Sequence, residues 1–169
     1  MMQRFWLTTH WPPLKGARPH TYYVYLQHEF GDLAQTLLPG DRVLFYELVT
    51  GRPRVESRPD GTKSVVKRER GRGGVIGLGT VSGGRRPFSW PAEAVQSYAD
   101  GTTMNWAWEV PVDGHDYSGF VDRRHVVRVL GYKPKYNMRG FGIGGSGLKE
   151  LDKRQFDELA SLFEASPRD

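Results

Sequence analysis

The chain has 169 residues, 38% hydrophobic and 25% charged, a composition typical of one globular domain and not of a disordered chain. Its 24 lysines and arginines outnumber 19 acidic residues, and the net charge of +5 favours a polyanionic partner. The chain has no cysteine, which excludes disulfides, thiolate catalysis and cysteine-ligated zinc. It also has no apolar run of membrane-spanning length and no signal-peptide pattern, so we expect a cytoplasmic protein with no membrane partner.

The first part of the chain reads as alternating strands and turns. Residues 3–9 predict a strand in which Phe5 and Leu7 alternate with Trp6 and Thr8, and the prolines at 12–13 end that strand. Residues 21–27 are rich in β-forming residues and predict a second strand. Residues 28–38 have room for a short helix, and the apolar run within 42–49 is typical of a strand covered on both faces.

The middle of the chain predicts a hairpin, a strand and a helix. Residues 52–58 and 62–67 are short polar segments joined by the turn residues Pro59-Asp60-Gly61, which favours a hairpin. A glycine-bearing strand is expected over residues 75–81. Residues 91–98, with proline in the first turn, predict a helix that stops at Asp100-Gly101.

The last part predicts two strands, a long loop and a closing helix. Strands are expected over residues 105–112 and 125–130, and residues 133–147 read as a loop. Asp152 and Gln155 have the spacing of a capping box before the final helix. Because no repeat, linker or composition break interrupts the chain, we expect one domain over residues 1–169.

Two motifs resemble a known family. Residues 39–47 read P-G-D-R-V-L-F-Y-E and residues 73–81 read G-G-V-I-G-L-G-T-V, after an opening F-W-L strand. This order resembles the EVE domains of the PUA-like superfamily, which also contains the YTH, ASCH and SRA modules, and Gly16-Ala17-Arg18 is similar to a Gly-Val-Arg stretch of that family. The resemblance implies an α+β, mostly β pseudo-barrel of about six strands with flanking short helices and a C-terminal helix. It also implies a non-enzymatic domain that recognises nucleic acid by holding a modified base in an aromatic pocket.

Aromatic residues near the amino terminus are the candidates for such a pocket. Period-two geometry places Trp6, Thr8 and His10 on one face of the opening strand, where a flat ring beside hydrogen-bonding groups suits a flipped base. The alternative is that Trp6 belongs to the core. Trp106 and Trp108 share a face with two valines, so at least one of them is expected to pack in the core. The candidate pocket residues are Trp6, Thr8, His10, Trp11, Tyr46 and Trp106.

Basic residues gather in the hairpin region and in the late loop. Between residues 52 and 72 eight lysines and arginines face three acidic residues, which favours a surface that follows phosphates, although a solvated edge strand has the same pattern. In the late loop basic and aromatic residues interleave. The candidate phosphate-binding residues are Arg18, Arg52, Arg54, Lys67, Arg68, Arg70, Arg72, Arg85, Arg86, Lys133, Lys135 and Arg139.

Signals for catalysis are weaker than those for binding. Residues 142–147 fit G-x-G-x-x-G, but no apolar strand precedes them, so we reject a dinucleotide site. His115-Asp116 lies in a polar loop that turn formation explains more simply. We therefore expect no catalytic residue, metal or cofactor, and a separate effector protein such as a nuclease. Two alternatives stay open: an RNA-binding module of RNA metabolism, and an ASCH-like hydrolase of a modified nucleoside; DNA and RNA both suit the surface.

Overall fold

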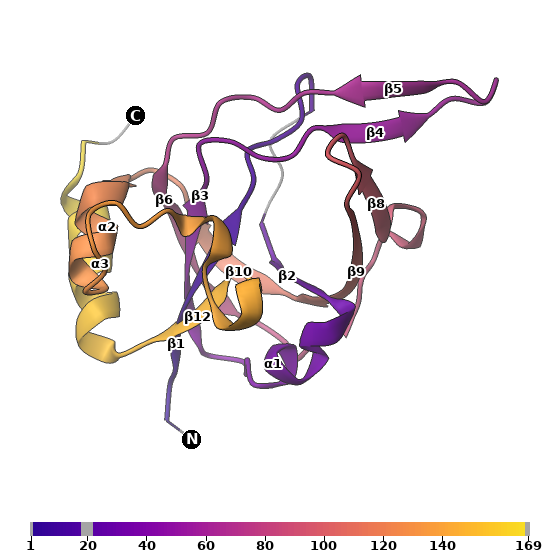
Figure 1. Ribbon diagram of the computed structural model, residues 1–169. Coiled ribbons are helices and arrows are strands. Elements are labelled where there is room, and N and C mark those ends of the chain that lie inside the picture. The colour runs from indigo at the N-terminus through magenta and orange to yellow at the C-terminus, as the bar shows by residue number, and fades with distance from the viewer. Residues whose placement is uncertain (1, 18–21, 168–169) are drawn as a thin grey trace.

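Two sheets face each other, and two helices cover the outer face of the first sheet (Figure 1). The computed structural model describes residues 2–17 and 22–167. The first sheet has six strands, β1 (Phe5–His10), β3 (Arg42–Glu47), β6 (Gly74–Val81), β10 (Val112–Asp116), β11 (Val121–Asp122) and β12 (Leu148–Leu151). The second sheet also has six strands, β2 (Val24–Gln27), β4 (Arg54–Ser57), β5 (Lys63–Val66), β7 (Arg86–Pro87), β8 (Val95–Tyr98) and β9 (Thr103–Val110).

The central strand β3 is covered on both faces, as the sequence predicts. It runs parallel to β1 and antiparallel to β6. Leu44 and Tyr46 face the helices, whereas Val43 and Phe45 face the second sheet. Because side chains alternate along a strand, one short apolar run contributes to two separate cores.

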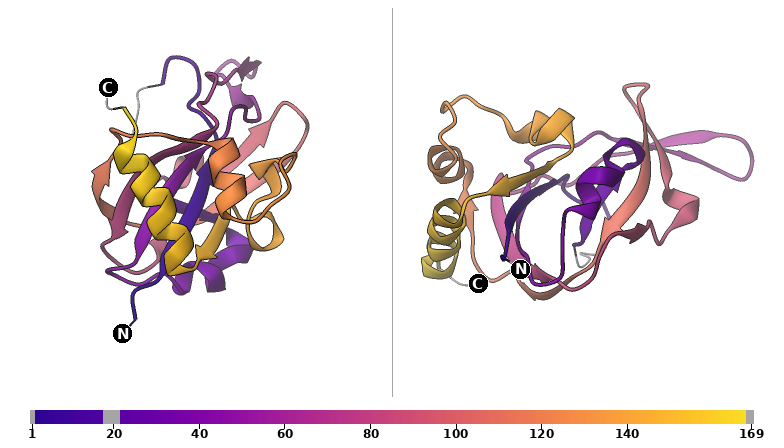
Figure 2. Two further views of the ribbon diagram at one scale, coloured as in Figure 1. Left: turned by 90° about the vertical axis from the view of Figure 1, so that its left-hand side faces the viewer. Right: turned by 90° about the horizontal axis from the view of Figure 1, so that it is seen from below.

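The helices occupy the outer face of the first sheet and one end of the space between the sheets (Figure 2). The α-helices are α1 (Gly31–Gln35), α2 (Arg123–Val129) and α3 (Lys153–Ala165). The 3₁₀ turns are η1 (His28–Phe30), η2 (Pro91–Glu93), η3 (Met138–Gly140) and η4 (Ile143–Gly145). No helix within the described residues is both long and apolar enough to cross a membrane.

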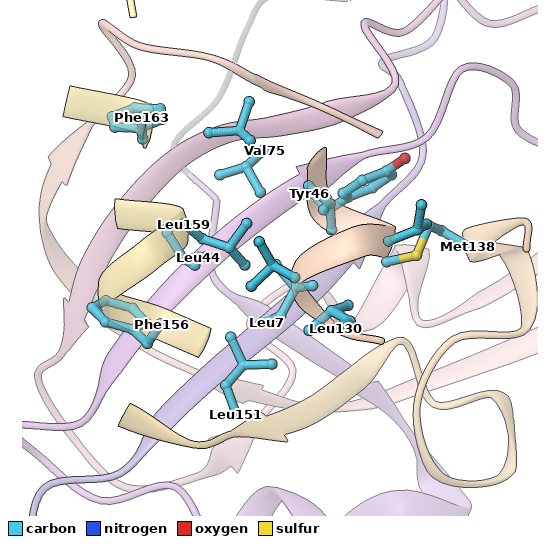
Figure 3. Packing of buried hydrophobic residues seen from close by; sticks show 14 of the residues in the cluster. Leu7, Leu44, Tyr46, Val75, Leu130, Met138, Leu151, Phe156, Leu159 and Phe163 are labelled. Atoms are coloured by element: carbon cyan, nitrogen blue, oxygen red, sulfur yellow. The ribbon is translucent and has the colours of Figure 1, made fainter. Parts of the chain in front are cut away.

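The C-terminal helix α3 begins and packs as predicted. Asp152 caps it and exchanges hydrogen bonds with Gln155, which forms the predicted capping box. Phe156, Leu159 and Phe163 are buried against the first sheet (Figure 3). The mostly β α+β fold with a C-terminal helix is therefore confirmed, with twelve strands where about six were expected. Among the described strands no ladder joins the two sheets into a closed barrel.

Two predicted elements are wrong. Residues 91–98 form the 3₁₀ turn η2 followed by strand β8, not a helix, because Gln96 and Tyr98 alternate inward with period two and β8 pairs with β9 and β4. Residues 125–130 belong to helix α2, not to a strand. Asp122 accepts a hydrogen bond from the His125 amide and so begins the helix, and this cap outweighs the low helix propensity of the valines that follow.

The predicted hairpin is confirmed as β4–β5, which extends away from the rest of the molecule (Figure 1). Its base joins the second sheet, where Arg54 pairs with Tyr98 of β8. The hairpin therefore forms one edge of the second sheet and projects from it.

Candidate functional site

Three adjoining hollows lie between the two sheets, near the carboxyl end of β1. We name the first the aromatic hollow; it has a volume of about 220 Å³ and is lined by His10, Trp11, Pro13, Leu14, Ala17, Tyr22, Tyr25, Arg68, Phe88, Gln96 and Trp106. The connecting hollow, of about 120 Å³, is lined by Thr9, His10, Trp11, Tyr25, Gln27, Leu48, Met104, Trp106, Arg139, Gly145, Ser146 and Gly147. The arginine hollow, of about 630 Å³, is lined by Trp11, Thr50, Gly51, Arg52, Pro53, Asp100, Met104, Arg139, Gly140 and Gly145.

Aromatic rings form the walls of the aromatic hollow. The His10 ring lies 4.8 Å from the Tyr22 ring and 6.2 Å from the Tyr25 ring, centroid to centroid. Tyr25 in turn meets Phe88 edge to face at 5.7 Å. Trp106 lies on β9, the strand that pairs with β2, and its indole nitrogen approaches the Tyr98 hydroxyl at 3.4 Å. The walls therefore come from both sheets, and a planar group between them would meet rings from β1, β2 and β9.

Trp11 lines all three hollows and lies where they meet. Prolines follow it in the sequence, so the chain leaves the first sheet at this point. Its indole meets Tyr98 edge to face at 5.0 Å, and the Arg68 guanidinium lies 4.8 Å from the indole centroid. These contacts from the second sheet and the hairpin region hold Trp11 in place.

Polar groups without a partner line the same space. Within the described residues, neither the Tyr25 hydroxyl nor the Gln27 side-chain amide hydrogen-bonds to another protein group. Burial, with a smaller effect of Glu109, raises the pKa of Tyr25 to about 12, so its phenol stays protonated at neutral pH and is both a donor and an acceptor. Burial likewise raises the pKa of Tyr22 to about 12. The hollows thus combine flat apolar walls with neutral hydrogen-bonding groups.

Three of the predicted pocket residues lie in the interior and line none of the hollows. Trp6 is 1% exposed, and its indole nitrogen donates to a buried carboxylate oxygen of Asp41 at 3.1 Å. Thr8 is 3% exposed on the same face. Tyr46 lies on the opposite face of the sheet, in the core under the helices (Figure 3). The structure therefore corrects the prediction that Trp6 forms the floor of a pocket and that Thr8 and Tyr46 contribute to it.

The physical reason is that alternation predicts the face of the strand on which a side chain lies but not how deeply that side chain is buried. Trp6 and His10 do share the face of β1 that looks toward the second sheet, as predicted. At the Trp6 end, Ala34 and Leu37 from the α1 region fill the space between the sheets. At the His10 end the sheets diverge into the hollows. His10, Trp11 and Trp106 are the predicted pocket residues that line a hollow, and Trp108 packs against the inner core, as expected of at least one of the pair.

The pocket-lining residues Tyr22, Tyr25, Gln27, Phe88, Gln96 and Met104 were absent from the sequence-based candidates. A signal for two of them exists in the second strand, where Tyr25 and Gln27 alternate with the buried Val24 and Leu26. Phe88 and Met104 carry no local signal, because only the pairing of β7 and β8 with β9 brings them to the hollows.

The predicted phosphate-binding residues fall into two groups. Several guanidinium groups stabilise the fold: Arg68 donates to the carbonyl oxygens of Arg52 and Pro12, and Arg85 donates to the carbonyl oxygen of Gly31. Ion pairs engage Arg54 with Glu56 and Glu93, and Arg86 with Glu109. The other described candidates are exposed or half-exposed cations, namely Arg52, Lys67, Arg70, Arg72, Lys133, Lys135 and Arg139. Arg18 lies outside the described residues. Phosphate binding by any of these residues stays a prediction.

His115 and Asp116 end strand β10 and do not lie in a loop as predicted, and their contacts are structural. The His115 ring approaches the carbonyl oxygen of Tyr22 at 2.7 Å and stacks on Phe45 and Tyr117. Asp116 accepts hydrogen bonds from the amide and hydroxyl of Ser118. In the described parts of the chain no three His, Cys, Asp or Glu side chains gather as metal ligands would.

Comparison with known proteins identifies the fold. No family model and no curated protein sequence matches this chain. Among solved structures, the chain is similar to human THYN1 protein in complex with 5-methylcytosine-containing DNA, with 15% sequence identity and a TM-score of 0.51. The similarity covers 98% of this chain and 100% of the THYN1 chain. The protein therefore has the fold of that structure, a mostly β PUA-like α+β fold.

Proposed function

We propose that this protein binds nucleic acid and holds one modified base, with 5-methylcytosine as the first candidate, in the aromatic hollow. The observation that carries the proposal is a hollow with rings from both sheets and the unpartnered Tyr25 hydroxyl, next to the connecting hollow that the unpartnered Gln27 amide lines. Ligand sites commonly have this composition, apolar and aromatic walls with a few convergent polar groups. At about 220 Å³ the hollow is smaller than the roughly 300–1,000 Å³ of sites for drug-sized ligands, which favours one planar group.

The energetics of base capture agree with this lining. Taking a base out of a stack costs a few kcal/mol. Stacking on aromatic side chains contributes about 1–3 kcal/mol per base, and hydrogen bonds to the base edge add to it. A methyl group on the base increases apolar contact with rings such as His10 and Trp106 without requiring a new polar partner.

The structural similarity supports the ligand class. The THYN1 structure contains DNA with 5-methylcytosine, and its fold is shared along the full length of this chain. On this basis we also propose that this chain is a member of the EVE domains, as the sequence motifs imply. A cytoplasmic location and a separate effector protein such as a nuclease belong to the same proposal, and co-purification from native cells tests them.

Exposed cations on the surface of the protein support contact with phosphates. Arg70 follows the hairpin, and Lys133 and Lys135 lie in the loop after α2. Such contacts position a nucleic acid without reading its sequence, and they make the affinity depend on salt.

Binding to matched oligonucleotides tests the proposal. DNA and RNA oligonucleotides that carry cytosine, 5-methylcytosine or methylated adenine at one position are compared by fluorescence anisotropy. Trp106→Ala should lower the affinity for the preferred modified oligonucleotide about tenfold or more, because a stacking wall is lost. Trp90→Ala is the matched control, since Trp90 is 63% exposed and is not among the residues that line the three hollows. Tyr25→Phe, which removes only the hydroxyl, should reduce discrimination between bases more than total affinity.

The outcomes separate this proposal from its alternatives. A preference for a modified base in RNA alone would favour the RNA-binding alternative. Conversion of a modified nucleoside, detected by mass spectrometry after incubation, would favour the hydrolase. Equal affinity for every base, unchanged by Trp106→Ala, would contradict base capture.

A further inference from the structure

The arginine hollow shares the lining residue Trp11 with the aromatic hollow, and the proposed base capture does not use it. It has a volume of about 630 Å³ and adjoins the connecting hollow through the shared residues Trp11, Met104, Arg139 and Gly145. A ligand held among His10, Tyr25 and Trp106 therefore has a continuous lining toward this second space. Because the hollow is larger than the aromatic one, its volume suits a group larger than a single base.

Arg139 enters the arginine hollow from the loop between α2 and β12. The 3₁₀ turn η3 orients this residue: Asn137 accepts a hydrogen bond from the Arg139 amide, and the neighbouring Met138 is buried in the core at 2% exposure. The guanidinium Nη2 donates to the Thr50 hydroxyl at 2.6 Å, and Thr50 lines the same hollow. Since Thr50 is a neutral partner and takes one of the five guanidinium donors, Arg139 keeps its charge and its other donors for a ligand.

Arg52 also lines the arginine hollow. Its Nη1 donates to the Thr102 hydroxyl at 3.0 Å, and its Nε lies 3.4 Å from a carboxylate oxygen of Asp100. Hydrogen bonds from Thr102 hold the pKa of Asp100 below its usual value, so this carboxylate is ionised at neutral pH. Two guanidinium groups thus face one carboxylate, and the lining has an excess of positive charge. The Arg52 side chain is 42% exposed, which leaves it accessible from solvent.

We infer that the arginine hollow holds the nucleotide next to the captured base, with the linking phosphate between Arg52 and Arg139. This inference rests on the proposed base capture and adds a second subsite to it. Arginine is suited to this role because its planar fork matches phosphate oxygens in a bidentate manner. Trp11 and Met104 offer the neighbouring base an apolar contact at the junction of the two hollows. The ligand class is therefore a dinucleotide step that contains the modified base, and not an isolated modified nucleoside.

A chemical change in the ligand, combined with matched variants, tests the second subsite. Oligonucleotides with one 5-methylcytosine are made with an uncharged methylphosphonate in place of the phosphate on its 5′ or its 3′ side. Their affinities are measured for the unmodified protein, Arg52→Met, Arg139→Met and Arg154→Met. Arg154 is the control because its side chain is 73% exposed on α3, which packs on the outer face of the first sheet. Thermal unfolding checks that each variant remains folded.

We expect the methylphosphonate on one side to weaken binding to the unmodified protein and to Arg154→Met about tenfold. In Arg52→Met and Arg139→Met the same change should cost about twofold or less, because the partner of that phosphate is already lost. Both arginine variants should keep the preference for 5-methylcytosine over cytosine. Equal methylphosphonate effects in all four proteins, or no effect on either side, would overturn the second subsite while leaving base capture intact. If the unmodified protein shows no preference for 5-methylcytosine over cytosine, both the second subsite and base capture are overturned.

Discussion

Replacing Asp41 by alanine should destabilise the protein by about 3 kcal/mol. Asp41 is 3% exposed, and its carboxylate accepts hydrogen bonds from the Trp6 indole at 3.1 Å and from the amides of Arg4 and Leu38 at 3.0 Å each. An unsatisfied buried donor costs about 1–3 kcal/mol. We assign about 2 kcal/mol to the fully buried indole and about 0.5 kcal/mol to each of the two partly buried amides, which water can reach.

Urea unfolding followed by circular dichroism measures this loss. For a chain of this size 1 kcal/mol corresponds to about 2–4 °C in Tm, so the variant should melt about 6–12 °C lower. The slope of the free energy against urea should not change, because the surface exposed on unfolding is the same. Asp157→Ala is the control: its carboxylate is 52% exposed in an ion pair on α3, and its loss should cost less than about 0.5 kcal/mol.

A double-mutant cycle assigns the loss to the indole. In a Trp6→Phe background the indole donor is already absent, so Asp41→Ala should cost about 1–2 kcal/mol less than in the unmodified protein. Below its melting temperature Trp6→Phe should also keep its preference for a modified base, because Trp6 lines none of the three hollows. A loss below about 1 kcal/mol for Asp41→Ala, or additive effects in the cycle, would refute a buried structural role for the Trp6–Asp41 pair.

Three further predictions concern backbone packing, pH and salt. Gly71→Ala should lower the free energy of unfolding in urea by about 3 kcal/mol or more, because the alanine Cβ would lie 1.8 Å from the carbonyl oxygen of Leu48. A loss below about 1 kcal/mol would contradict this packing. The hydrogen bond from Arg4 holds the pKa of Glu150 below its ordinary value of 4.5, so the pair's stabilisation is complete above about pH 4.5 and is lost as the pH falls through the lowered pKa. For this half-exposed pair the stabilisation is below about 1 kcal/mol, and Glu150→Gln should flatten the acid side of a stability–pH curve. Arg70→Ala should reduce the slope of log affinity against log salt by about 1 for all oligonucleotides, whereas an unchanged slope would exclude a phosphate contact at this residue.

Local sequence patterns determined most of the strands and the closing helix. Alternation and short apolar runs are properties of neighbouring residues, so alternation predicts β1, and apolar runs predict β3 and β6, without knowledge of the fold. The turn at Pro39-Gly40 and the capping box at Asp152 are equally local, because their hydrogen bonds join residues three apart. The valine-rich residues 125–130 were predicted as a strand because β-branched residues favour strands, although the Asp122 cap before them indicates a helix.

Only the tertiary structure decided which aromatic side chains are buried and which line a hollow. Trp6 and His10 have the same alternation and lie on the same face of β1, yet Trp6 is sealed by the α1 region and His10 reaches the hollows. Burial at a given point depends on what covers the strand there, and the covering residues are distant in sequence. Trp11 and Trp106 line one hollow, and Arg52 and Arg139 line another. Both arrangements likewise require the second sheet and the loop before β12 to fold against β1.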